Sequence, residues 1–217
     1  LTRSRMSGGL AGYVSGQANL AAGPVAAGAD ILLRVNTTAG AVDTSIELGG
    51  RTLVVKFATG NVFEVSLSNL SLTIADFLTI EGSVSFSDTT IDGQPAQVFA
   101  GEGLTIFVGR GPAKLSTGET NPLAMGVLLT NGRIGLVKIG STYALVAEGT
   151  VSLVGVAGVT LTGTVTARVN TTGQAINQTL EIPGSPDAGV PVVFATPALV
   201  TELVAADATL AVAGQSL

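Results

Sequence analysis

Hydrophobic and polar side chains alternate along much of the chain with a period of two residues. The alternation is clearest at Leu70, Leu72 and Ile74, and it resumes at Leu78 and Ile80 after a short gap. Such a pattern predicts strands with one apolar face and one face of Ser, Thr and Glu. No long segment has the 3.6-residue period of a helix. We therefore expect strands over most of the chain.

Turn signals interrupt this alternation about every ten residues. The strongest is Asn131-Gly132, and Asp92-Gly93, Gly49-Gly50 and Gly140-Ser141 are similar. Gly and Asn tolerate the positive φ that two-residue hairpin turns need. Tight hairpins place neighbouring strands antiparallel. The sequence thus predicts an all-β, antiparallel, hairpin-rich fold, built as an elongated sandwich or flattened barrel. A β-solenoid is the alternative, although it would need a repeat of roughly 20–30 residues.

A five-residue box occurs twice. Arg34-Val-Asn-Thr-Thr38 returns letter for letter as Arg168-Val-Asn-Thr-Thr172, an offset of 134 residues (168 minus 34). Phe57-Ala58-Thr59 returns as Phe194-Ala195-Thr196, after a short insertion near residues 185–187. This pattern indicates a structural repeat array. We expect a window cut from such an array, with a partial repeat at residues 1–86 and a nearly complete one at 87–217.

The box is the main candidate for a site. Because Val35 belongs to the apolar face, Arg34 and Asn36 should point the other way, and the Asn side chain should serve the following turn. We expect Arg34 to reach Glu47 across a hairpin, which would contribute a few tenths to about 1 kcal/mol. The proposed structural repeat box consists of Arg34, Asn36, Glu47, Arg168, Asn170 and Glu181, with Arg168 and Glu181 forming the second pair.

Composition narrows the possible partners. The chain has 217 residues, of which 46% are hydrophobic but only 4% aromatic and 12% charged, with a net charge of −5. An acidic chain without a basic patch disfavours nucleic acid and anionic membranes as partners. No run of 18 uncharged apolar residues is present, so we expect no membrane insertion.

The absence of Cys and His removes several kinds of chemistry. Disulfides, thiol catalysis, Cys/His zinc sites and imidazole bases cannot be built. A Lys114–Ser116 dyad is the only arrangement for serine hydrolysis worth considering. A two-carboxylate glycosidase stays open, because any acidic pair could meet in the fold, although two Tyr and no Trp make it a poor sugar site. We therefore expect no catalysis and no cofactor. The alternative is a calcium- or carbohydrate-binding module whose site lies in residues 87–143. It predicts either clustered acidic residues or exposed Tyr13 and Tyr143 beside a cleft.

The segment from Tyr143 to Asn177, with Ala208–Leu217, resembles the long tandem repeats of very large, adhesin-like bacterial surface proteins. The resemblance implies a structural or adhesive repeat at the cell surface or outside the cell. It also implies neighbouring repeats as partners, and cell-surface or matrix polysaccharide as a further one. Many such proteins carry calcium-binding modules, but this chain has no Gly-Gly-x-Gly-x-Asp nonapeptide and no Asp-x-Asp-x-Asp loop.

Overall fold

The computed structural model describes residues 8–75, 77–115, 117, 119, 121–185, 189–213 and 215–216. All regular structure in these residues is β-strand, which confirms the predicted all-β class. The strands are β1 (Ala11–Ala22), β2 (Val25–Asn36), β3 (Val42–Leu48), β4 (Arg51–Phe57), β5 (Val62–Ile74), β6 (Leu78–Ile91), β7 (Gln94–Arg110), β8 (Met125–Ile139), β9 (Thr142–Val154), β10 (Val159–Asn170), β11 (Ile176–Leu180), β12 (Val190–Phe194), β13 (Val200–Val212) and β14 (Gln215–Ser216). No helix long and apolar enough to cross a membrane occurs in this described part of the chain.

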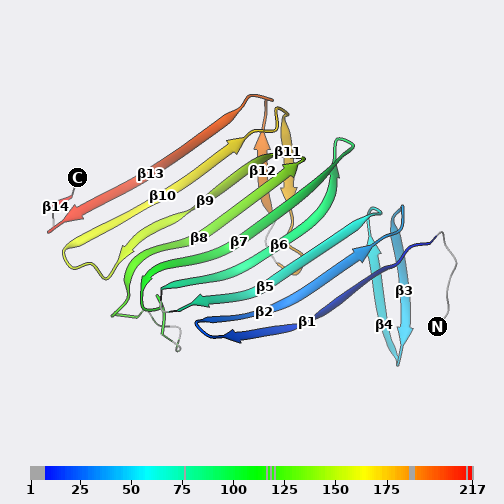
Figure 1. The fold of residues 1–217 in the computed structure, drawn as a ribbon, viewed down its shortest axis with the longest axis horizontal. Coiled ribbons are helices and arrows are strands. Elements are labelled where there is room, and N and C mark those ends of the chain that lie inside the picture. Colours follow the sequence, from blue (N-terminus) through cyan, green and yellow to red (C-terminus); the bar gives the residue numbers. More distant parts are fainter. Residues whose placement is uncertain are drawn as a thin grey trace.

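Ten strands form one antiparallel sheet in the order β1-β2-β5-β6-β7-β8-β9-β10-β13-β14 (Figure 1). The other four form two hairpins, β3–β4 and β11–β12, which are inserted between the sheet neighbours β2 and β5, and β10 and β13. The predicted antiparallel, hairpin-rich architecture is confirmed. The sheet is open and does not close into a barrel. The solenoid alternative is wrong, because antiparallel neighbours replace stacked coils.

Three of the four predicted turns connect neighbouring strands. Asp92-Gly93 joins β6 to β7, Gly49-Gly50 joins β3 to β4, and Gly140-Ser141 joins β8 to β9. Asn131-Gly132 instead lies inside β8, where Asn131 has a φ of 52° and the pairing with β9 shifts register. The hairpin predicted there is wrong, because the positive φ that Asn tolerates also suits a β-bulge.

Similar register shifts occur in several other strand pairs of the sheet, at positions that lie roughly opposite one another. Left-handed backbone marks several of them, at Asn69 with a φ of 51°, Gly82 with 137° and Gly103 with 58°. Each bulge adds an unpaired residue, which bends the strand and increases its twist. A line of bulges therefore divides the long strands into two halves.

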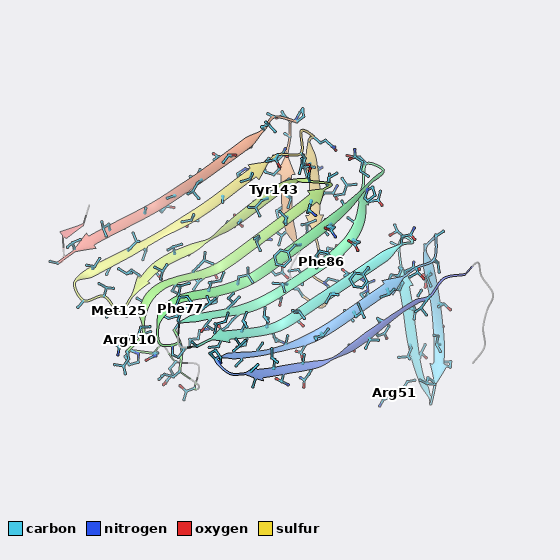
Figure 2. The ribbon with its side chains drawn as sticks, viewed as in Figure 1. Arg51, Phe77, Phe86, Arg110, Met125 and Tyr143 are labelled. Atoms are coloured by element: carbon cyan, nitrogen blue, oxygen red, sulfur yellow. The ribbon has the colours of Figure 1, made fainter. Side chains whose placement is uncertain are left out.

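The two faces of the sheet differ as the alternation predicts. Ser66, Ser85 and Ala100 stand directly opposite one another in β5, β6 and β7, on the face that carries the hairpins. The intervening positions point to the other face and are apolar. One row of opposed, half-buried side chains on that face consists of Leu33, Val65, Phe86, Phe99, Leu136, Leu145 and Val169. Figure 2 labels Phe86 on β6, near the middle of the sheet.

The main cluster of fully buried residues lies on the hairpin-bearing face, beneath β11–β12. The hairpin contributes Ile176, Leu180, Val190, Val192 and Phe194, together with Ile182 just after β11, and the sheet contributes Ile91, Ala96, Ala100, Val137, Ile139 and Ala144. The floor is partly made of small residues. A Cβ added to Gly135 would lie only 2.5 Å from Cγ2 of Val192. The hairpin therefore packs closely on the sheet at a position where the sheet has no side chain.

The two sequence copies adopt the same order of elements. The series β1, β2, β3–β4 and β5 corresponds to β9, β10, β11–β12 and β13, and both series belong to one continuous sheet. The division predicted between residues 86 and 87 falls inside β6. This division therefore describes the repeat in the sequence and does not coincide with the end of a strand. In the insertion predicted near residues 185–187, residues 186 and 187 lie outside the described residues.

Candidate functional site

The first copy of the box builds a closed turn around a fully buried asparagine at the end of β2. The amide nitrogen of Asn36 donates to the carbonyl oxygens of Gly40 (2.9 Å) and Thr59 (2.8 Å). Its amide oxygen accepts from the backbone nitrogen (3.0 Å) and the hydroxyl (2.7 Å) of Thr38. Both ends of the amide are satisfied, as burial requires. This confirms the predicted role of the Asn side chain in the turn.

The second copy repeats this arrangement at the end of β10. Asn170 is fully buried. Its amide nitrogen donates to the carbonyl oxygen of Gln174 at 2.9 Å. Its amide oxygen accepts from the backbone nitrogen of Thr172 at 3.0 Å and from the Thr172 hydroxyl at 2.7 Å. Each asparagine thus fixes how a hairpin leaves the sheet.

The threonine that follows each asparagine ties the turn to the preceding sheet strand. The Thr37 hydroxyl donates to the carbonyl oxygen of Leu10 at 3.2 Å and accepts from its backbone nitrogen at 2.8 Å. Thr171 makes the same two contacts with Tyr143, at 3.0 Å and 2.9 Å. The box therefore holds three elements together: a sheet strand, its neighbour and the hairpin.

The box arginine fastens the hairpin to the sheet. In the first copy the Arg34 guanidinium lies 5.1 Å from the Phe57 ring centroid, donates to the carbonyl oxygen of Lys56 at 3.1 Å and pairs with Glu64 at 2.7 Å. This combination joins β2, β4 and β5 through one planar group.

The second arginine makes the equivalent set of contacts. Arg168 lies 4.9 Å from the Phe194 ring centroid, donates to the carbonyl oxygen of Val193 at 2.8 Å and approaches Glu202 at 3.9 Å. It joins β10, β12 and β13. The repetition of all three contacts shows that the box is a structural joint in both copies.

The predicted partners of the two arginines are wrong. Glu47 lies near the tip of the β3–β4 hairpin, where it accepts a hydrogen bond from the Thr52 hydroxyl at 2.6 Å. Glu181 follows β11, and its backbone carbonyl accepts from the Ser85 hydroxyl at 3.1 Å. The pairing partners come instead from β5 and β13, because the hairpin folds away and brings the next sheet strand beside the arginine.

The Glu64 carboxylate sits in an unfavourable setting for its charge. Burial raises the pKa of Glu64, Arg34 opposes this through its charge and hydrogen bond, and the nearby Glu181 carboxylate raises the pKa further. By contrast, hydrogen bonds from Asn69 and Gln17 lower the pKa of the exposed Asp30. Both effects follow from which form of the carboxyl group the surroundings favour.

A polar hollow lies on the hairpin-bearing face between the hairpin β11–β12 and the loop that follows β7. Two adjoining depressions, of about 410 and 430 Å³, share Ser71 and Glu81 in their linings. Lys114 lines the first and pairs with Glu81 at 3.2 Å. Neither depression is lined by Tyr13 or Tyr143. Ser116, the other half of the dyad considered from the sequence, lies outside the described residues.

Glu102 is a residue that the sequence did not single out. It lines the second depression, is only 3% exposed, and neither of its carboxylate oxygens has a hydrogen-bond partner within the described part of the protein. Its only sequence signal is a charged residue between Gly101 and Gly103 in an otherwise apolar run. No group of three or more metal-ligating side chains occurs among the described residues.

Comparison with known proteins assigns no family to the chain. No family model matches the chain, and no curated protein or solved structure is significantly similar to it.

Proposed function

We propose that the chain is a non-catalytic structural repeat module that lengthens a large bacterial surface or secreted protein. One observation carries this proposal. The two copies of the box make the same contacts and contribute their strands to one uninterrupted sheet. A repeat that adds strands to a growing sheet lengthens a protein without changing its local chemistry.

The repeat unit gives the expected geometry of this growth. A full period runs from β1 to β8 and contributes β1, β2, β5, β6, β7 and β8 to the sheet, while β3–β4 folds out as a hairpin. With strands about 4.8 Å apart, each unit extends the array by roughly 29 Å along the hydrogen-bonding direction, before twist shortens it. The module acts as a spacer, and adhesion would come from its surface or from other parts of the same protein.

The two buried asparagines and Lys114 fit a structural role better than a catalytic one. The amide groups of the two fully buried asparagines are engaged by hydrogen bonds that fix the turn and the base of the hairpin. The Lys114 ammonium group is half-exposed and paired with Glu81, so it lacks the desolvated setting that activates a lysine. Extracellular placement and contact with polysaccharide belong to the same proposal and rest on the sequence resemblance alone.

The test is to measure how the longest dimension of the protein changes with the number of 134-residue units. Chains with one, two and three additional 134-residue units would be compared by small-angle X-ray scattering. The longest dimension is expected to grow by a constant increment of roughly 29 Å per unit, with an unchanged cross-section. A compact particle whose longest dimension does not grow in equal steps would rule out the spacer function.

A further inference from the structure

The two hairpins are copies of each other, yet only one of them is covered. Their apolar positions correspond in pairs: Val42 with Ile176, Ile46 with Leu180, Leu48 with Ile182, Leu53 with Val190, Val55 with Val192 and Phe57 with Phe194. In β11–β12 and the residues just after β11, all six positions are buried. The apolar side chains of this hairpin thus form a face that packs against another surface.

In β3–β4 three of the same six positions face solvent. Ile46 and Leu48 are 50% and 66% exposed, whereas their counterparts Leu180 and Ile182 are 6% and 4% exposed. Leu53 is also exposed, although Val190 is buried. The two hairpins agree only at their base, where Val55 and Phe57 are buried like Val192 and Phe194. The difference therefore begins where the hairpin leaves its own sheet strands.

The surroundings explain this difference. The hairpin β11–β12 lies across β9, β8 and β7, with β12 contacting all three strands. The hairpin β3–β4 points in the same direction, but there the sheet formed by the described residues ends at β1, and the hairpin extends past that edge (Figure 1). Arg51, at its tip, lies well away from the sheet (Figure 2). The surface that should lie beneath it corresponds to β7 and β8.

The same edge also lacks a strand partner among the described residues. The counterpart of β1 is β9, and β9 pairs along its length with β8, for example Leu145 with Leu136. On its outer side β1 has no neighbour in the sheet order of the described residues. Val14 and Leu20 of β1 are 68% and 55% exposed. A long, exposed, apolar edge strand is a site for pairing with another strand.

We propose that β1 and the apolar face of β3–β4 dock onto a second copy of β6–β8, supplied by a preceding unit of the same polypeptide. This inference rests on the proposed function as a tandem module and names the partner of each unit. The occupant is fixed by the molecule itself, since β11–β12 and β9 already show both halves of the interface in place. The missing β8 pairs with β1, and its face receives Ile46, Leu48 and Leu53.

Gly135 provides a specific marker for this interface. It lies in β8 beneath the covered hairpin, where an added Cβ would be 2.5 Å from Val192, 3.1 Å from Val190 and 3.6 Å from Leu180. Their counterparts in β3–β4 are Val55, Leu53 and Ile46. A side chain at the copied position of Gly135 would therefore block the seating of β3–β4. It would leave the backbone of the added strand free to pair with β1.

The experiment adds the missing segment in place of residues 1–8. A copy of residues 78–141, from the start of β6 to the turn before β9, is placed directly before Gly9, the position that corresponds to Thr142. Amide hydrogen exchange is then followed by mass spectrometry in peptides covering β1 and β3–β4. We expect exchange in both regions to slow by at least about tenfold relative to the unextended chain.

The matched control carries Gly135→Val in the added copy only. We expect β1 to stay protected through strand pairing, while β3–β4 exchanges as fast as in the unextended chain. Exchange in the original β7–β9 reports that the rest of the protein is folded. If β3–β4 stays fast in the extended chain, or is slowed equally by the Val variant, the proposed seating is wrong.

Two further outcomes separate this inference from its alternatives. If scattering shows regular lengthening but β3–β4 never becomes protected, the spacer function stands and the docking proposal fails. If the unextended chain gains protection in β3–β4 as its concentration rises, with dimers seen by sedimentation, the occupant is a separate molecule. That result would overturn the assignment to a preceding unit of the same polypeptide.

Discussion

The hairpins β3–β4 and β11–β12 are built from the same pattern but differ in what lies beneath them. Both leave the sheet through a buried asparagine, and both are held by an arginine stacked on a phenylalanine. Only β11–β12 rests on the small residues of β7 and β8. The exit of each hairpin from the sheet is thus set by local contacts, whereas the burial of the hairpin depends on the strands that lie beneath it.

Two kinds of contact therefore hold each hairpin: the hydrogen bonds of its turn and the apolar packing of its side chains. Hydrogen bonds of the turn are formed within a few residues or with the adjacent strand, so they are complete in each copy. Apolar burial on the hairpin β11–β12 requires strands that lie more than 20 residues before it in sequence. In the tandem array that we propose, stability would come from both the unit and the interface between units. The present chain shows one interface formed and one that is not formed among its described residues.

The largest expected effect comes from breaking the covered hairpin and comparing it with the uncovered one. Leu180→Ala removes a buried side chain and should lower the free energy of unfolding by about 3 kcal/mol. Ile46→Ala at the corresponding exposed position should change it by less than about 0.5 kcal/mol. Urea unfolding monitored by circular dichroism measures both. Equal losses would mean that β3–β4 is buried in solution. In the extended chain, Ile46→Ala should become nearly as costly as Leu180→Ala.

The buried asparagines should behave in the opposite way, because their environments are the same in both copies. Asn36→Ala and Asn170→Ala each remove several hydrogen bonds and leave buried turn groups without partners. Each should cost about 2–3 kcal/mol in the free energy of unfolding. Asn177→Ala, at an exposed position of β11, is the control and should change stability by less than about 0.5 kcal/mol. A large cost at Asn170 with none at Asn36 would show that the two joints are not equivalent.

The sequence predicts what depends on local pattern. Alternation at Leu70, Leu72 and Ile74 places them in a strand, and the Asp92-Gly93 turn forms as expected, because both features depend on adjacent residues. Asn131-Gly132 shows the limit of such signals. Its preference for positive φ is satisfied equally by a turn or a bulge, and only the length of pairing between β8 and its neighbours decides.

The features that sequence could not supply depend on distant strands. The partner of Arg34 is Glu64, because the hairpin folds out and places β5 beside β2. The main buried core lies on the face with Ser and Ala rather than on the apolar face, because β11–β12 returns over Ala96, Ala100 and Gly135. No pairwise spacing along the chain reveals these contacts before the strand order is known.

The smallest expected effect concerns the two glutamates that pair with the box arginines. Glu64 lies in the interior of the sheet with a 13% exposed side chain, and Glu202 lies on β13 with 51% exposed. Burial raises the pKa of Glu64 in the folded protein above the ordinary value of 4.5. The folded state therefore binds the proton more tightly than the unfolded state does.

The sign of the resulting pH dependence follows from this difference. Between pH 4.5 and the raised pKa of Glu64, the folded chain holds more protons than the unfolded chain, so this residue makes stability fall as the pH rises. Glu64→Gln should remove that decline, and the difference in unfolding midpoint between the variant and the parent should change steadily across the interval. Glu202→Gln is the matched variant at the exposed copy. A parent and a Glu64→Gln variant with parallel pH profiles would show that burial does not govern this carboxyl group, and the two arginine joints would then be electrostatically alike.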